Sequence, residues 1–96
     1  MFDLNIHMKV ESEKDFKELQ NQFSVWRKRF PMFKHDVQQI ERMINMHIQE
    51  HSKIMVAYRQ THSRSHLERA QKEIDTINQI IDTVEKLELM AMLSRG

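Results

Sequence analysis

Cysteine is absent from this 96-residue chain, and glycine and proline occur once each, glycine as the last residue. Without thiols, the chain forms no disulfides and offers no thiolate ligands to zinc or iron–sulfur centres. Phosphate-binding loops, dinucleotide fingerprints and nucleophile elbows need glycine where backbone must approach a ligand closely or take positive φ. The sequence therefore excludes these nucleotide-binding and thiol-based classes, and its lack of cysteine predicts an intracellular, cytoplasmic protein.

Long apolar runs are absent as well. None approaches the ~18 to 20 residues that span a bilayer, and the first ten residues lack the continuous apolar stretch of a signal peptide. We therefore expect a soluble protein that has no membrane partner. Charged residues make up 30% of the chain and hydrophobic residues 40%. This composition is typical of long helices with few loops, and the length predicts a single domain over residues 1–96 or half of an oligomer.

The first ten residues alternate between apolar and polar side chains. This period of two predicts a half-buried β-strand, or arm, over residues 1–10. No later segment repeats the alternation, so the strand has no partner within its own chain. A lone strand leaves a row of backbone N–H and C=O groups unpaired. We therefore expect it to pair with a second copy of the chain or with a partner's sheet.

Apolar residues recur at spacings of three and four after the arm, which predicts helices over residues 12–30, 31–61 and 65–94. The second and third helices are each about 30 residues long and are separated by a short polar stretch. Equal lengths and a short connection favour a long antiparallel hairpin on which the first helix lies. The predicted fold class is mainly α: a short N-terminal β-strand followed by three helices, within a helical oligomer.

Three local signals set the helix boundaries. Ser12 is a good N-cap, and Asp15 three residues later makes an imperfect capping box. Pro31 disfavours helical geometry in the preceding residue but suits the first turn of a new helix, which predicts a sharp bend. Ser65 followed by Glu68 repeats the capping-box pattern and favours a turn over one continuous helix.

The C-terminal segment carries apolar side chains in all directions around the helix axis, and one neighbouring helix cannot cover them. A second chain is therefore implied. Together with the apolar side of the arm, this segment supplies the predicted oligomer interface: Phe2, Leu4, Ile6, Met8, Leu89, Met90 and Leu93.

The string from His47 to His51 is similar to the His-x-x-Glu-His motif of inverted zinc peptidases. Two histidines four residues apart on one helix face can share a metal ion, and the antiparallel hairpin places Glu73 as a third candidate ligand. The alternative interpretation is that each histidine is a packed ring, hydrogen-bonded to a carboxylate or a carbonyl. We favour that interpretation and predict no cofactor, keeping His47, His51 and Glu73 as candidate metal ligands.

Two basic blocks are candidate surfaces for nucleic acid or for an acidic partner. The first interleaves cations with Trp26 and Phe30, an arrangement on which single-stranded bases can stack. Its cations also favourably oppose the dipole at the end of a helix. The second block lies around the predicted hairpin tip, where a solvated charged surface is the alternative. The candidate residues are Arg27, Lys28, Arg29, Arg59, Arg64, Arg69 and Lys72.

No nucleophile–base pair is visible in the sequence, and its serines have no assignable acid–histidine relay. We therefore predict a non-enzymatic, oligomeric helical interaction module. It would act as an assembly, adaptor or regulatory protein through contacts with itself and with another protein. The first alternative is DNA or RNA binding through the basic blocks 27–34 and 59–72. The second is a helical protein with a histidine-based metal site.

Overall fold

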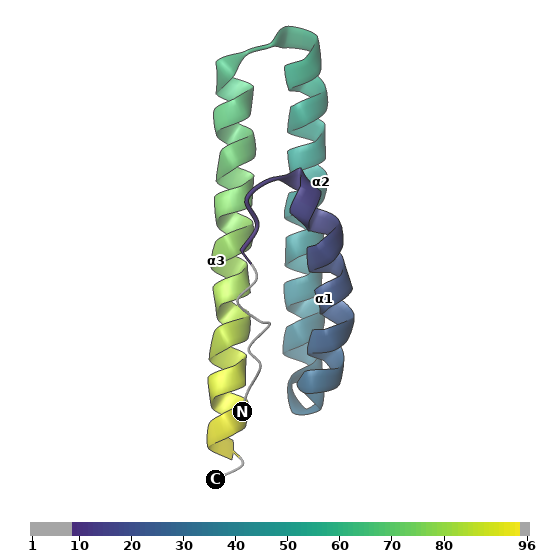
Figure 1. The fold of residues 1–96 in the computed structure, drawn as a ribbon, viewed down its shortest axis with the longest axis vertical. Coiled ribbons are helices and arrows are strands. Elements are labelled where there is room, and N and C mark those ends of the chain that lie inside the picture. The colour runs from purple at the N-terminus through teal and green to yellow at the C-terminus, as the bar shows by residue number, and fades with distance from the viewer. Residues whose placement is uncertain (1–8, 95–96) are drawn as a thin grey trace.

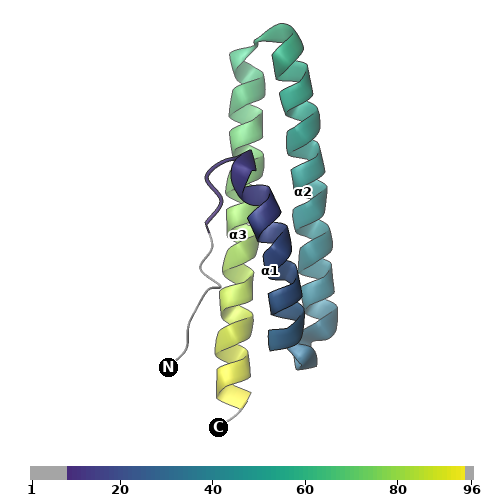
Figure 2. The ribbon, with the colours of Figure 1, turned by 45° about the vertical axis from the view of Figure 1, so that its right-hand side comes forward.

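The computed structural model describes residues 9–94, and this part of the chain contains three α-helices, α1 (Phe16–Arg29), α2 (Lys34–Thr61) and α3 (Arg64–Ser94). Helices α2 and α3 form a long antiparallel hairpin, and α1 lies along the half of the hairpin that is remote from its turn (Figures 1 and 2). The molecule measures 54 × 23 × 17 Å. The prediction of three helices with a terminal hairpin is confirmed.

The predicted N-terminal strand falls mainly on residues 1–8, which lie outside the described residues. Its last two residues, Lys9 and Val10, lie in neither a helix nor a strand. Val10 is nevertheless 1% exposed and belongs to the core. Its backbone N–H donates to Asn78 Oδ1 at 2.8 Å, and Asn78 Nδ2 donates to its carbonyl at 2.8 Å. One side chain of α3 thus satisfies both backbone groups, as a neighbouring strand would.

Residues 12–15 start the first helix as the sequence predicted. The carboxylate of Asp15 accepts hydrogen bonds from the backbone N–H groups of Glu11, at 2.9 Å, and of Ser12, at 3.4 Å. These bonds fix a 3₁₀ turn over Glu13–Asp15, which continues into α1. The acidic side chain therefore acts on the residues before it, as the second half of a capping box does.

The bend at Phe30 and Pro31 is also confirmed. The N–H of Phe30 closes the last turn of α1 on the carbonyl of Trp26 at 2.9 Å, and its backbone then leaves helical geometry at φ −121°, ψ 59°. Pro31 opens a 3₁₀ turn, Pro31–Phe33, that leads directly into α2. A proline forces this departure in the residue before it and fits the first turn after it.

The turn between α2 and α3 separates two distinct helices, but its boundary differs from the prediction. His62 takes left-handed geometry, φ 52° and ψ 27°, and its N–H bonds to the carbonyl of Tyr58. Helix α3 then begins at Arg64, and the N–H of His66 donates to the carbonyl of Ser63 at 3.0 Å. A capping box at Ser65 would place the start of the helix after that residue. The left-handed residue His62 reverses the chain earlier, so Ser65 lies inside the first turn of α3.

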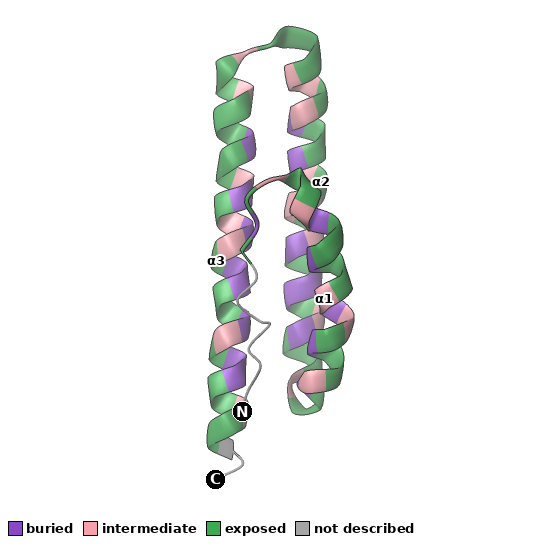
Figure 3. Cartoon of the chain, in the orientation of Figure 1, coloured by how far each residue is buried: buried purple, intermediate pink, exposed green. Residues whose placement is uncertain are grey.

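The core lies between the facing sides of the three helices, as the burial pattern shows (Figure 3). Helix α1 contributes an aromatic stripe, and the hairpin contributes mainly isoleucine and valine. The buried cluster comprises Val10, Phe16, Leu19, Phe23, Trp26, Phe30, Val37, Ile40, Ile44, Ile74, Ile77, Ile80, Ile81, Val84 and Leu87.

Helix α1 is too short to cover the whole hairpin. Its 14 residues span roughly 21 Å at 1.5 Å per residue, whereas the 28 residues of α2 span roughly 42 Å. The half of the hairpin near the turn consequently packs α2 on α3 without a third helix (Figure 1). No helix in residues 9–94 is long and apolar enough to cross a membrane.

Candidate functional site

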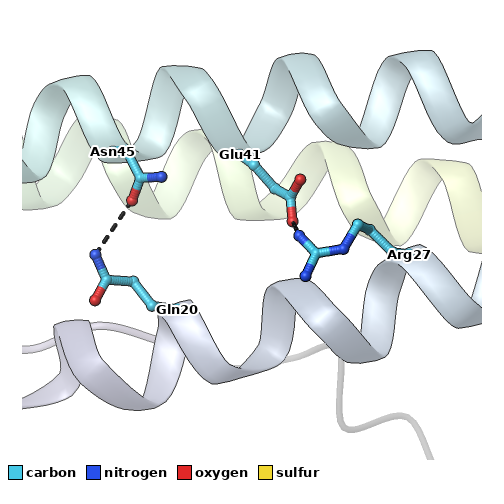
Figure 4. Close-up of polar contacts among 4 residues, drawn as sticks. All are labelled: Gln20, Arg27, Glu41 and Asn45. Carbon is cyan, nitrogen blue, oxygen red and sulfur yellow. Dashed lines mark hydrogen bonds and ion pairs between the residues drawn. The ribbon is translucent and has the colours of Figure 1, made fainter.

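The first basic block is held by acidic side chains of the hairpin. Arg27 on α1 forms an ion pair with Glu41 on α2, and Gln20 Nε2 donates to Asn45 Oδ1 at 3.2 Å two turns earlier along α1 (Figure 4). Arg29 lies 3.5 Å from the carboxylate of Glu88 on α3. Both glutamates are buried. These pairs attach the end of α1 to both hairpin helices, so Arg27 and Arg29 serve internal contacts.

The second basic block surrounds the hairpin turn and is exposed to solvent. Arg59, Arg64, Arg69 and Lys72 are all exposed, and Arg64 Nε lies 3.8 Å from Glu68 Oε1 in an exposed pair one helical turn apart. Such a pair contributes little to stability. The turn lies at the opposite end of the molecule from the end of α1 (Figure 1). The two blocks therefore do not merge into one continuous groove.

The candidate metal ligands separate into a pair and a single ring. His47 Nδ1 lies 2.6 Å from Glu73 Oε2, a hydrogen bond in which the nitrogen donates to the carboxylate. The contact joins α2 to α3 and matches the alternative interpretation of a histidine bonded to an acid. No group of three or more histidine, aspartate or glutamate side chains able to hold a metal ion occurs between residues 9 and 94.

His51, one turn further along α2, has a different environment. It is 4% exposed, and the ring of Phe16 meets it edge to face with 5.0 Å between ring centroids. Its Nδ1 is buried without a hydrogen-bond partner among the described atoms. Burial lowers the pKa of His51 below its usual 6.5, while the carboxylates of Glu13 and Glu73 act in the opposite direction. The imidazole is therefore neutral at physiological pH.

The C-terminal part of the predicted oligomer interface is exposed. Leu89 and Leu93 are 59% and 80% exposed, and Met90 and Met92 are exposed as well. Leu87, on the same part of α3, is buried and belongs to the core cluster. The other predicted interface residues, Phe2, Leu4, Ile6 and Met8, lie outside the described residues.

Two surface hollows formed by the described residues bear on function. The larger, 530 Å³, is lined on the described part of the chain by residues 35–46 of α2. The second, 260 Å³, is formed by three segments: residues 11–13 before α1, residues 51 and 55 of α2, and residues 67–74 of α3. The second hollow is therefore a cleft between elements.

The sequence patterns missed three groups that organise these sites. Glu41 and Glu88 are buried acids that form ion pairs with Arg27 and Arg29. Both lie beside apolar stripe positions, where an unpaired charge is unfavourable. Asn78 carries no such signal, because its role is to hold Val10, which is 68 residues away along the chain. Comparison of the chain with protein-family models, curated proteins and solved structures found no match.

Proposed function

We propose that this chain is a non-enzymatic helical interaction module that self-associates through the last two turns of α3 and presents the assembled bundle to another protein. The observation that carries the proposal is the exposed apolar surface formed by Leu89, Met92 and Leu93. These residues are spaced three and four apart, so they share one face of α3.

Several features support self-association at this surface. The three side chains form one apolar strip next to charged positions such as Asp82 and Lys86, which lie on the preceding turns. Isolated apolar residues on a surface need no explanation, but a contiguous strip is typical of an interface. A second copy of the chain is a suitable partner, because a two-fold axis places the same apolar strip of both chains in contact.

The experiment is a measurement of mass by light scattering at micromolar concentration. We expect at least twice the 11.7 kDa of the single chain. The double variant Leu89→Glu with Leu93→Glu removes two apolar side chains, each contributing about 1.5–3 kcal/mol when fully buried, and places charges in the interface. We expect its dissociation constant to rise by a factor of about 100 or more.

The matched control is Val25→Glu with Val56→Glu. These valines are also exposed, at 42% and 50%, but they lie on α1 and α2 and are separated from each other. The control adds the same charge and should leave the mass unchanged, while circular dichroism verifies that both variants stay helical. A monomeric parent, or equal dissociation of the two variants, would refute the proposal.

A further inference from the structure

The methionines of the described chain lie on its surface rather than in its core. Methionine is among the residue types that are most often buried, yet the buried cluster contains no methionine of residues 9–94. Met55 is partly buried, and the other methionines in this range are exposed: Met32, Met43, Met46, Met90 and Met92. A chemical change at these side chains therefore acts mainly on the surface and leaves the packing of the core intact.

Met92 is the methionine that belongs to the apolar strip of α3. It is 41% exposed and lies on the face of the helix that Leu89 and Leu93 share. Met90 lies on a different side of α3, because residues two apart on a helix do not face each other. The last turns of α3 extend beyond the bend that joins α1 to α2 (Figures 1 and 2), so neither of these helices covers the strip.

The thioether of methionine is the sulfur that peroxides oxidise in this chain, because cysteine is absent. A lone pair of the sulfur attacks one oxygen of hydrogen peroxide, so that an S–O bond forms and the O–O bond breaks. The hydroxide that leaves takes the proton of the transferred oxygen and becomes water. The thioether is oxidised to a sulfoxide, the peroxide is reduced, and an apolar side chain becomes polar.

We infer that Met92 is an oxidation site through which peroxides control the self-association of this chain. The inference rests on the proposed function and names a regulation of the same surface. The sulfoxide oxygen accepts hydrogen bonds, and its burial among leucine side chains without a donor is unfavourable. A two-fold interface contains the strip twice, so oxidation of both chains introduces two such groups. Enzymatic reduction of the sulfoxide restores the thioether and makes the change reversible.

The oxidation takes place on the free chain, because self-association covers Met92. Free and associated chains exchange, and each oxidised chain reassociates less well, so that free chains accumulate. Met46 supplies an internal reference, since it is 62% exposed and lies on α2, away from the strip. Its oxidation does not depend on whether the chain is associated.

The first experiment treats the full chain with hydrogen peroxide and follows each methionine by peptide mass spectrometry. For a dimer, the free fraction falls from about 85% to about 20% when the chain concentration rises from about one tenth to about ten times the dissociation constant. Met92 should therefore be oxidised about fourfold more slowly at the higher concentration, by mass action. Met46 should be oxidised at the same rate at both concentrations.

The second experiment measures the effect of oxidation on assembly by light scattering. Peroxide should raise the dissociation constant of the parent about tenfold or more, and methionine sulfoxide reductases should restore it. Met92→Leu keeps an apolar side chain of similar size that peroxide does not oxidise. This variant should assemble like the parent and keep its dissociation constant in peroxide. The matched control, Met46→Leu, removes a more exposed methionine outside the strip and should respond to peroxide as the parent does.

Circular dichroism on the same samples verifies that oxidation leaves the chain helical. The inference alone is overturned if the parent keeps its dissociation constant in peroxide, if Met92→Leu weakens as much as the parent, or if Met92 is oxidised at equal rates at both concentrations. A parent chain that is monomeric before peroxide is added overturns the proposed function and this inference with it.

Discussion

The contact between Asn78 and Val10 gives the most direct test of how the N-terminal segment is held. Asn78→Ala removes two hydrogen bonds of 2.8 Å from a residue that is buried in the core. If the segment stays in place, the N–H and C=O of Val10 lose their partners, at about 1–3 kcal/mol for each group that remains buried. If the segment detaches, both groups reach water, but the Val10 side chain loses its burial, at about 1.5–3 kcal/mol.

The variant adopts whichever of these two states has the lower free energy. The loss of stability therefore cannot exceed the cost of detaching Val10. Alanine also has a better helix propensity than asparagine, by up to about 0.7 kcal/mol, which offsets part of the loss. We therefore expect Asn78→Ala to lower the free energy of unfolding by about 1–2.5 kcal/mol. The assay is urea unfolding followed by circular dichroism, with Gln79→Ala, at the exposed neighbouring position, as the matched control.

Asn78→Asp sharpens this test. A carboxylate still accepts from the N–H of Val10 but cannot donate to its carbonyl, whereas a protonated carboxyl group can do both. The folded-state pKa of the carboxyl group introduced by this substitution is then raised above its unfolded value. Its stabilising contribution should be fully present below the unfolded pKa of about 3.9 and be lost as the pH rises through the folded pKa. A loss in Asn78→Ala no larger than that in Gln79→Ala, with no recovery of Asn78→Asp in acid, would refute the proposed role of Asn78.

Two further predictions concern the histidine and the hairpin tip. Because burial lowers the pKa of His51 below 6.5, the unfolded chain binds more protons than the folded chain between the two pKa values, and stability should fall as the pH drops through 6.5. Urea unfolding at about pH 7.5 and about pH 5 should show a larger loss in the parent than in His51→Gln, and equal losses would contradict this. If the basic tip binds DNA or RNA, the binding should be weak, should fall steeply with salt and should disappear in Arg64→Glu with Arg69→Glu. Arg27→Glu with Arg29→Glu should instead disrupt packing, because these cations pair with Glu41 and Glu88. A fluorescence titration measures the binding of nucleic acid, and circular dichroism measures the loss of fold.

The helices and the bend were predictable because their causes are local in sequence. Pro31 restricts Phe30, Asp15 reaches back to Ser12, and the apolar stripes repeat at helical spacing. The contacts that build the sites are not local. Asn78 holds Val10 from 68 residues away, and no pattern in either segment indicates the other. The histidine motif shows the same limit, because spacing placed His47 and His51 on one face, but Glu73 bonds to the first ring only.

The position of Pro31 also determines which surfaces of the hairpin stay open. Helix α1 must end at Arg29, and the 3₁₀ turn before Phe16 limits it to 14 residues, about half the length of α2. The half of the hairpin that α1 covers receives the aromatic core and the two ion pairs of the buried glutamates, Glu41 and Glu88. His51 lies where the two halves meet, with its ring against Phe16, and the other half keeps an exposed leucine, Leu67, at the edge of a pocket. Extending α1 towards the tip would close this pocket, so the length of the first helix determines how much of the hairpin surface stays open.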